Sequence, residues 1–341
     1  MRAAVLDRAG SVSVRDVPEP VPGDRALVRV AQAGICGTDL KIASGAVPVT
    51  RPRVLGHEMT GWVQRPGARG AVPAGTAVLV NPALFCGRCD LCRRDRPQLC
   101  RSGGLLGRDC DGVFADLVAV DEACLHPIPA GLPPAAGALL QVLSTCVHGQ
   151  SWLHPAPGDT AVVTGLGVSG LLHVQLLAGR GVRVIAGITR SAAKRDLALR
   201  LGATAVAHPD DAARLAAEVT GGRGADIVIE CAGTRPALAQ AMRLAAAGGT
   251  VLVFGTTTQA GDGLGRDDLP TYDWYLKELT IRNSRAARPR DCDTAIQLAA
   301  ERRVELEPLV TARFPLEAAA GALAACAEAG QLKVVLDVAA G

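Results

Sequence analysis

The sequence has little net charge and no long apolar run, and its number of cysteines is odd. Its 36 basic residues face 33 acidic ones, so the formal charge is only +3, and the composition indicates no surface for nucleic acid or membrane. No segment has the apolar length of a transmembrane helix, and residues 1–10 lack the apolar core of a signal peptide. We therefore expect a cytoplasmic protein with no nucleic-acid partner and no membrane partner.

The cysteine count argues against a disulfide framework. Eleven cysteines are present, an odd number, and several are clustered, which favours metal sites or free thiols. The length of 341 residues is sufficient for two domains with separate cores.

A nucleotide site is predicted within Thr160–Ile188, which reads as strand, glycine turn, helix and second strand. The turn is a G-x-G-x-x-G motif made of Gly165, Leu166, Gly167, Val168, Ser169 and Gly170. Its first glycine permits the tight turn, the second lets the backbone approach a pyrophosphate, and the third lets the helix lie close to the strand. A packing turn of another α/β protein is the alternative, and the strand–helix–strand setting disfavours it.

The end of the second strand indicates which dinucleotide is preferred. An NAD site places Asp or Glu there to hold the ribose 2′-hydroxyl, whereas this chain has Thr189, Arg190 and Ser191, with Lys194 one turn later. Hydroxyls and a guanidinium suit a 2′-phosphate, which a carboxylate would repel. We predict NADP(H) rather than NAD(H), although Arg190 as a mere solvated charge is the alternative.

Three potential metal ligands stand ahead of this fold. Cys36 is followed about twenty residues later by His57 and Glu58. A thiolate, an imidazole and a carboxylate form a ligand set typical of zinc with an open position. Each residue alone is commonly structural, so the prediction of a catalytic zinc depends on their joint occurrence.

A second metal site is predicted in a lobe with the spacing C-x2-C-x2-C-x7-C, formed by Cys86, Cys89, Cys92 and Cys100. Four thiolates so close in the chain can close a tetrahedral structural zinc site. An iron–sulfur cluster is the rival, but in bacterial ferredoxins the fourth cysteine follows after three residues and precedes proline. Here Arg101 follows. A nucleic-acid-binding ribbon is a weaker alternative, because ribbons use two separated cysteine pairs.

With these motifs in view, the whole chain resembles the zinc-containing medium-chain alcohol and polyol dehydrogenases, the branch of the sorbitol, threonine and glucose dehydrogenases. Besides the sites above, the motifs that carry the resemblance are Val54–Gly61 (VLGHEMTG), Gly112–Leu117 (GVFADL), Gly224–Gly233 (GADIVIECAG), Gly248–Gly255 (GGTVLVFG), Lys277–Ile281 (KELTI) and Pro308–Glu317 (PLVTARFPLE). The resemblance implies an α/β fold, with a Rossmann doubly wound parallel sheet and a β-rich GroES-like catalytic domain. Residues 1–143 and 285–341 would form the catalytic domain and residues 144–284 the dinucleotide-binding domain, with the active site in the cleft between them.

The resemblance also implies roles for single residues. Cys36 and His57 match catalytic zinc ligands, Glu58 matches a carboxylate on or next to the metal, and Thr38 matches the hydroxyl that passes the substrate's proton. Zinc would polarise the substrate oxygen while hydride moves to the nicotinamide. The ring would meet the backbone of two segments, whose expected cofactor contacts are Gly255, Thr256 and Asn283.

Two positions depart from many relatives. Gln141 stands where they carry a glutamate; its amide oxygen can bind zinc but brings no charge. We hypothesise that Glu58 moves on and off the metal while Gln141 is a ligand or a neighbour of a ligand. Lys41 stands where histidine often takes part in the proton relay, and either relays protons, grips an anionic substrate, or lies on the surface with its ammonium in water.

The leading functional prediction is an NADP(H)- and zinc-dependent oxidoreductase with two zinc ions per chain, acting on a secondary alcohol or ketone of a polyol, sugar or cyclitol. One alternative is an enzyme adapted for double-bond reduction or for epimerisation through a transient ketone, and another is a non-catalytic NADPH-binding protein. Exposed sheet edges and the resemblance favour a homodimer or homotetramer.

Overall fold

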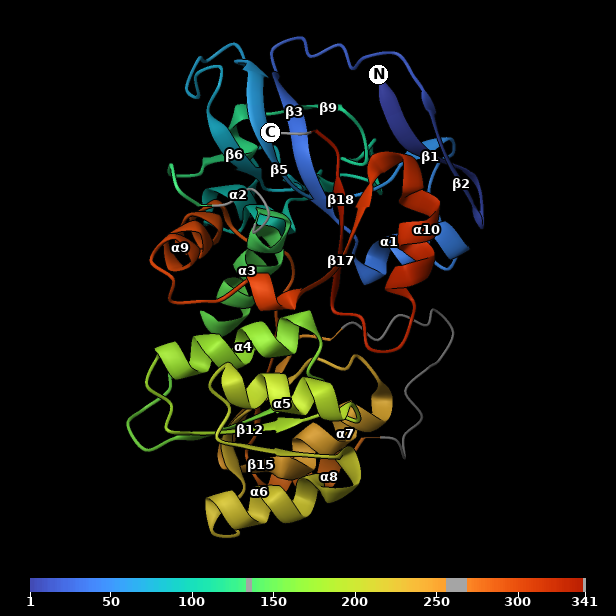
Figure 1. Ribbon diagram of the computed structural model, residues 1–341. Helices are drawn as coiled ribbons and strands as arrows, with labels where there is room; N and C mark the ends of the chain where they lie inside the picture. Colours follow the sequence, from blue (N-terminus) through green and yellow to red (C-terminus); the bar gives the residue numbers. More distant parts are fainter. Residues whose placement is uncertain (133–136, 256–268, 340–341) are drawn as a thin grey trace. The chain divides into compact units, whose positions relative to one another are not determined.

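The computed structural model describes residues 1–132, 137–255 and 269–339, which divide into two compact units (Figure 1). Unit 1 comprises Met1–Ser144, Ala286–Arg302 and Leu306–Gly341, and unit 2 comprises Thr145–Arg285 with Arg303–Glu305. Thr256 and most of the glycine-rich stretch that follows it lie outside the described residues. Within the part that is described, no helix is long and apolar enough to cross a membrane.

Unit 1 is built mainly of β-strands. Its strands are β1 (Arg2–Arg8), β2 (Ser11–Asp16), β3 (Ala26–Gly34), β4 (Arg53–Val54), β5 (Glu58–Arg65), β6 (Ala77–Val80), β7 (Ala83–Leu84), β8 (Gly104–Leu105), β9 (Leu117–Val120), β10 (Leu125–Pro127), β17 (Val310–Pro315) and β18 (Lys333–Asp337). Its helices are α1 (Gly37–Ser44), α2 (Asp90–Arg93), α9 (Pro289–Ala300) and α10 (Ala319–Cys326), while α3 (Gly137–Gln150) runs from unit 1 into unit 2. Short 3₁₀ turns are η1 (Pro97–Leu99), η2 (Glu122–Cys124), η5 (Glu307–Leu309) and η6 (Leu316–Ala318).

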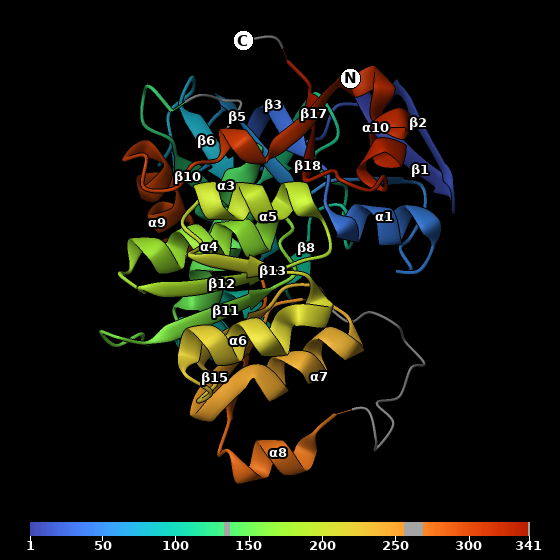
Figure 2. The ribbon, with the colours of Figure 1, turned by 60° about the horizontal axis from the view of Figure 1, so that its bottom comes forward.

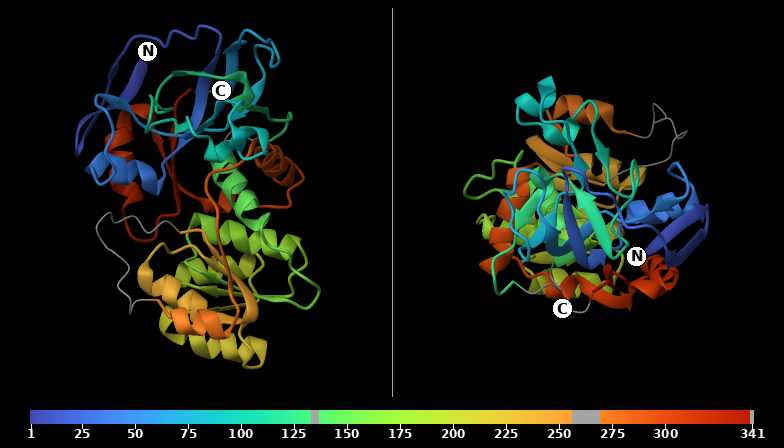
Figure 3. Two further views of the ribbon diagram at one scale, coloured as in Figure 1. Left: turned by 180° about the vertical axis from the view of Figure 1, so that it is seen from behind. Right: turned by 90° about the horizontal axis from the view of Figure 1, so that it is seen from above.

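The largest sheet of unit 1 has the strand order β10-β6-β5-β3-β18-β17, with β9 also paired to β3. Strand β3 lies inside this sheet, between β5 and β18. Most of its residues from Ala26 to Gly34 are therefore buried, as expected for an apolar run covered on both faces. The C-terminal strand β18 pairs antiparallel with β3, so segments from the two ends of the chain share one core. Figure 3 shows the same closeness from behind, with the red helix α10 beside the blue N-terminal strands.

Unit 2 is a parallel sheet with helices on both faces, which confirms the predicted Rossmann fold. Its strands are β11 (Thr160–Thr164), β12 (Val184–Ile188), β13 (Ala205–Ala207), β14 (Ala225–Glu230), β15 (Ala245–Val253) and β16 (Thr280–Asn283). Its helices are α4 (Val168–Gly179), α5 (Ala192–Arg200), α6 (Ala212–Thr220), α7 (Arg235–Leu244) and α8 (Thr271–Leu276), with a 3₁₀ turn η4 (Pro209–Asp211).

The strand order of unit 2 is β13-β12-β11-β14-β15-β16, with every neighbouring pair parallel. Helices α4 and α5 lie on one face of the sheet, and α6 and α7 lie on the other (Figure 2). The chain therefore changes direction across the sheet between β11 and β14. The carboxyl ends of strands at such a switch point are where open α/β sheets bind ligands.

Candidate metal and dinucleotide sites

Three predicted zinc ligands meet at one end of the β3–β5 pair. Cys36 follows β3 as the N-cap of α1, while His57 and Glu58 stand at the start of β5. The antiparallel register places Gly34 directly opposite Glu58, and this brings the two segments together. One ligand atom from each of the three residues lies within 4.8 Å of the others, so together they can hold one metal ion.

Asp39 supports this cluster, although sequence reasoning gave it no role. Its Oδ1 lies 3.4 Å from Nδ1 of His57, and its Oδ2 accepts a 2.9 Å hydrogen bond from the backbone N–H of Cys36. The carboxylate is fully buried. A carboxylate behind a ligating histidine fixes the orientation of the ring and increases its basicity. The sequence feature that could have identified Asp39 is its position three residues after the N-cap of α1, where an acidic side chain often accepts the backbone N–H of the N-cap residue.

The negatively charged groups around His57 shift the pKa of its imidazole. Burial by itself would lower that pKa, but the Asp39 carboxylate and the Cys36 sulfur outweigh burial and raise it well above its ordinary value. The surroundings of His57 therefore favour positive charge at this position. A Zn²⁺ ion would supply that charge, so the donor set fits such a metal.

Lys333 is the second residue that sequence reasoning missed. Its Nζ donates to Oε2 of Glu58 at 2.7 Å and to the backbone oxygen of Ile35 at 3.0 Å, and both ionic side chains are at least 95% buried. Burial tends to lower the pKa of Lys333, but the charges of Glu58 and Cys36 raise it above its ordinary value. The lysine opens the apolar strand β18, far from Glu58 in the sequence, so only the fold pairs them.

These partners change the charge balance of the site. With Cys36 as a thiolate and Asp39 and Glu58 as carboxylates, the cluster would carry three negative charges, of which Lys333 would offset one. A divalent cation such as Zn²⁺ would then balance the other two without a charge from residue 141.

Gly34 makes room for Glu58. A Cβ on Gly34 would collide with Oε2 of Glu58 and lie 3.3 Å from the Cβ of Ala138, so the first turn of α3 adjoins this carboxylate. Gln141 is buried in the same helix, three residues after Ala138 and hence on the same side of it. Thr38 and Lys41 lie in α1, and both side chains are half-buried.

The four cysteines of the lobe also converge. They meet the same 4.8 Å criterion, and the sulfur of Cys89 lies 3.5 Å from that of Cys92 and 3.9 Å from that of Cys100. Backbone N–H groups of Arg88 and Cys89 lower the pKa of the Cys86 thiol to about 6, which favours the thiolate. The donor set therefore fits a metal held by sulfur alone.

The glycine turn of unit 2 has the shape required for a dinucleotide. Gly165 adopts φ +85°, and a Cβ there would lie 2.5 Å from the backbone nitrogen of Ala232. A Cβ on Gly170 would collide with the backbone oxygen of Gly165. Nothing lies within 4 Å of a Cβ on Gly167, the exposed N-cap of α4, and the next two residues, Val168 and Ser169, are half-buried. The open space faces the helix N-terminus, as a bound pyrophosphate requires.

The residues predicted to read the 2′ position cluster where β12 joins α5. Arg190 is exposed, and Thr189 and Lys194 are half-buried. Ser191 is the N-cap of α5, and its Oγ accepts the backbone N–H of Lys194 at 3.4 Å. Partial burial lowers the pKa of Lys194. No carboxylate occupies residues 189–191.

The predicted nicotinamide contacts lie at the ends of two neighbouring strands. Gly255 follows β15, and Nδ2 of Asn283 in β16 donates to the backbone oxygen of Val253 at 3.2 Å. Glu230 at the end of β14 was not predicted; its Oε1 accepts the backbone N–H of Gly233 at 2.8 Å, and burial raises its pKa. Thr256 lies outside the described residues.

Comparison with known proteins agrees with this combination of sites. Residues 22–130 match the alcohol dehydrogenase GroES-like domain, and residues 169–301 match the zinc-binding dehydrogenase domain. A probable zinc-binding alcohol dehydrogenase of Mycobacterium tuberculosis is 34% identical, over 97% of this chain and 87% of its own length. A sorbitol dehydrogenase of Halalkalibacterium halodurans is 30% identical over 93% of both chains.

A solved structure agrees as well. A Sinorhizobium meliloti protein described as a zinc-binding dehydrogenase bound to NADP superposes with a TM-score of 0.90, at 35% identity and over 98% of each chain. The chain belongs to the zinc-dependent medium-chain alcohol and polyol dehydrogenases, and its β-rich unit is the GroES-like domain of that family. It is an oxidoreductase, which confirms the predicted family and class of reaction.

Proposed function

We propose that the protein is an NADP(H)-dependent dehydrogenase that interconverts a secondary alcohol and a ketone on a polyol, sugar or cyclitol. The observation that carries this proposal is the cluster of half-buried Cys36 with buried His57 and Glu58, in a chain whose second Rossmann strand ends without an acid. The names of the sorbitol dehydrogenase and of the NADP-bound protein support the substrate class and the cofactor.

When bound, zinc polarises the substrate oxygen as a Lewis acid, and the nicotinamide accepts or returns the hydride. In the oxidative direction the alcohol loses a proton from oxygen and a hydride from carbon, giving the ketone. The residues of this chain hold and orient the reacting groups. Cys36 and His57 would bind the metal, and the Asp39 carboxylate, whose Oδ1 lies 3.4 Å from Nδ1 of His57, would help to orient the imidazole. Thr38 receives the hydroxyl proton.

Glu58 is proposed to move on and off the metal, with Gln141 as a ligand or a neighbour of a ligand. Lys333 would compete with the metal for Glu58, because its ammonium lies 2.7 Å from Oε2. The Glu58→Gln variant should sharply reduce zinc content or activity. Wild-type values for both would refute a role for this carboxylate.

Lys41 is proposed to relay protons or to bind an anionic group of the substrate. The half-buried side chain belongs to α1, the helix that begins next to Cys36. A Lys41→Ala variant with an unchanged pH–rate profile and an unchanged KM would show instead that the side chain is a surface cation.

A second zinc ion is proposed for the lobe of Cys86, Cys89, Cys92 and Cys100, whose role is structural because all four ligands come from the protein. We also propose a cytoplasmic location. All eleven cysteines are free, which is typical of reducing compartments.

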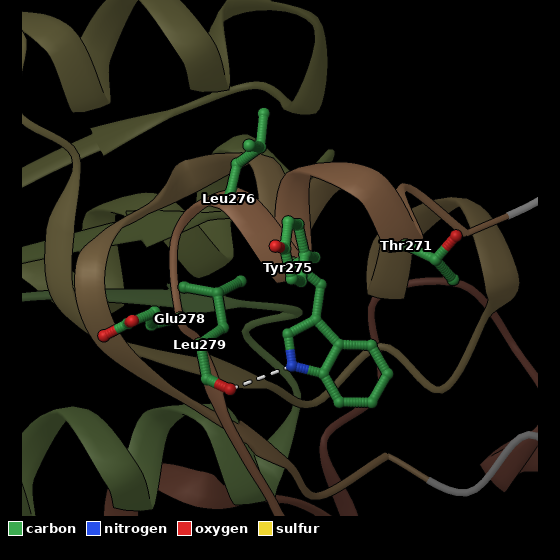
Figure 4. A pocket seen from close by; sticks show the side chains of 6 residues that line it. Thr271, Tyr275, Leu276, Glu278 and Leu279 are labelled. Atoms are coloured by element: carbon green, nitrogen blue, oxygen red, sulfur yellow. Dashed lines mark hydrogen bonds between the residues drawn. The ribbon is translucent and has the colours of Figure 1, made fainter.

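We propose that the oligomer, a homodimer or homotetramer, includes a contact between two copies of unit 2. Strand β16 is the edge of the parallel sheet, and Arg282 and Asn283 on it are exposed. The preceding helix α8 presents exposed apolar side chains, Tyr275 at 76% and Leu276 at 59% among them. Figure 4 shows Tyr275 and Leu276 among the residues that line a hollow, together with Leu279. The indole N–H of Trp274, which also lines it, donates to the backbone oxygen of Leu279 at 2.9 Å. An unpaired edge beside exposed aromatic residues suits a second copy of the same surface.

The oligomer is tested by analytical ultracentrifugation of the wild type, Tyr275→Lys and the control Arg214→Ala, which changes an exposed position of α6. A wild-type monomer at micromolar concentration would refute the proposal, as would an oligomer that Tyr275→Lys leaves intact.

The enzymatic proposal is tested by elemental analysis and by assays with polyols, sugars and cyclitols. We expect two zinc ions per chain and a kcat/KM for NADP⁺ well above that for NAD⁺. One zinc ion that remains in Cys36→Ala would mean that the catalytic metal is missing. Absence of net cofactor turnover with these alcohols would favour double-bond reduction, epimerisation or non-catalytic binding of NADPH.

A further inference from the structure

We propose that Arg195 is a positioning residue for NADP(H): it fixes the loop between β12 and α5 so that backbone N–H groups face the 2′-phosphate. This inference rests on the proposed preference for NADP(H). Arg195 lies in the first turns of α5, and its side chain is half-buried beneath the loop formed by Thr189, Arg190 and Ser191.

One guanidinium nitrogen of Arg195 makes two hydrogen bonds to this loop. Its NH1 donates to the backbone oxygen of Thr189 at 2.8 Å and to that of Arg190 at 2.9 Å. The loop is also tied at its start, because the N–H of Thr189 donates to the oxygen of Ala207, and the oxygen of Ile188 accepts the N–H of Gly165. The strand end is thus held by the neighbouring strand, by the glycine turn and by Arg195.

These bonds determine where the peptide groups of the loop point. In a trans peptide the carbonyl and the following N–H point in opposite directions. Since the oxygens of Thr189 and Arg190 are turned toward Arg195, the N–H groups of Arg190 and Ser191 are turned away from it. Neither N–H donates to an acceptor among the described residues. Two backbone donors therefore remain for a ligand, next to the exposed side chain of Arg190.

The same bonds remove an obstacle to anion binding. A carbonyl oxygen carries partial negative charge and would repel a phosphate dianion if it faced the ligand. With both oxygens bound to a guanidinium, the loop offers N–H groups at the N-terminus of α5, which is a favourable environment for an anion. A loop already held in this conformation also loses little entropy on binding. AMP and NAD(H) lack the 2′-phosphate, so the effect is specific to NADP(H).

The test compares the binding of 2′,5′-ADP and 5′-AMP to the full-length wild type, Arg195→Met, Arg195→Lys and the control Arg200→Met, by calorimetry. Arg200 is an exposed arginine at the end of the same helix. For Arg195→Met we expect about a tenfold weaker affinity for 2′,5′-ADP, with 5′-AMP within about twofold of the wild type, because only the phosphate-facing groups are released. Arg195→Lys should recover part of the affinity, because an ammonium has enough N–H donors for both carbonyl oxygens but stands on a shorter stem. Arg200→Met should bind both compounds like the wild type.

Retained binding of 5′-AMP shows that a variant is folded, and faster hydrogen exchange in residues 188–192 of Arg195→Met would report the released loop directly. The positioning role is overturned if Arg195→Met binds 2′,5′-ADP like the wild type or if it loses both compounds equally. A wild type that binds 2′,5′-ADP no better than 5′-AMP would instead refute the preference for NADP(H).

Discussion

Replacing Lys333 by methionine should destabilise the metal-free protein much more than the zinc-loaded protein. At 2.7 Å and an effective dielectric constant of about 20, the attraction between Lys333 and Glu58 is roughly 6 kcal/mol before desolvation is counted. Removing one partner of a buried pair leaves the other buried and uncompensated, which costs about 3–5 kcal/mol of unfolding free energy. In the zinc-loaded protein Glu58 has the metal as a counter-ion, so we expect a loss of only about 1–2 kcal/mol.

The difference between the two losses must appear as tighter zinc binding. About 2–3 kcal/mol corresponds to a roughly 30- to 150-fold lower dissociation constant for zinc, because every 1.4 kcal/mol is tenfold. The double variant Glu58→Gln/Lys333→Met should recover most of the metal-free stability, since neither charge remains.

The assay is hydrogen exchange of the β18 amides with and without zinc, together with zinc competition against a chromophoric chelator. Exchange is preferred to a melting temperature because a chain of two units does not unfold in one step. Lys277→Met is the matched control, because Lys277 donates to backbone oxygens in unit 2 and should leave zinc affinity unchanged. Two results would refute the idea that Lys333 and zinc compete for Glu58. One is an equal loss of stability in the metal-free and zinc-loaded forms of Lys333→Met, and the other is an unchanged zinc affinity in that variant.

Three further predictions concern other parts of the chain. Thr189→Asp places a carboxylate at the end of β12 and should shift the kcat/KM ratio by about 100-fold or more from NADP⁺ toward NAD⁺; an unchanged ratio would contradict the assignment of this strand end. Cys100→Ser should remove one zinc ion per chain by elemental analysis, while the Cys36 cluster keeps its own; two zinc ions in this variant would argue against a four-cysteine site. Burial lowers the pKa of His173 to about 3, so between about pH 6.5 and pH 3 this histidine binds a proton in the unfolded chain but not in the native chain. Stability should therefore fall by up to about 1.4 kcal/mol per pH unit from pH 6.5 toward pH 3, and hydrogen exchange in α4 should show a smaller fall in His173→Asn, which does not titrate.

Much of the fold was predictable because its signals are local. Strand β14 (Ala225–Glu230) lies within the motif Gly224–Gly233, since a short apolar run between glycines has few alternatives. Helix α4, which the sequence predicts after the glycine turn, begins inside that turn at Val168. Strand β15 begins at Ala245, before the motif Gly248–Gly255, as small residues extend the ladder at its start.

The candidate sites likewise divide into features with local sequence signals and features that only the fold produces. The cysteine lobe, the glycine turn and the pairing of Cys36 with His57 and Glu58 depend on residue types at short spacings, so the sequence reveals them. Chemistry restricts what can bind four thiolates, or an imidazole beside a thiolate, wherever the chain places them. The family resemblance rests on these motifs and on their order.

Tertiary structure alone decided how these groups are balanced and oriented. Lys333 reaches Glu58 because the C-terminal strand pairs with β3, a contact between residues 275 positions apart that no spacing rule contains. Arg195 binds the backbone oxygens of Thr189 and Arg190 and so orients the peptide groups of their loop. The sequence of that loop shows only that its side chains are polar. The sequence by itself therefore indicated where metal ligands and a dinucleotide turn lie, because ligand chemistry resides in residue types. The fold decided the charge and direction of each group, because burial and hydrogen bonding depend on neighbours distant in the chain.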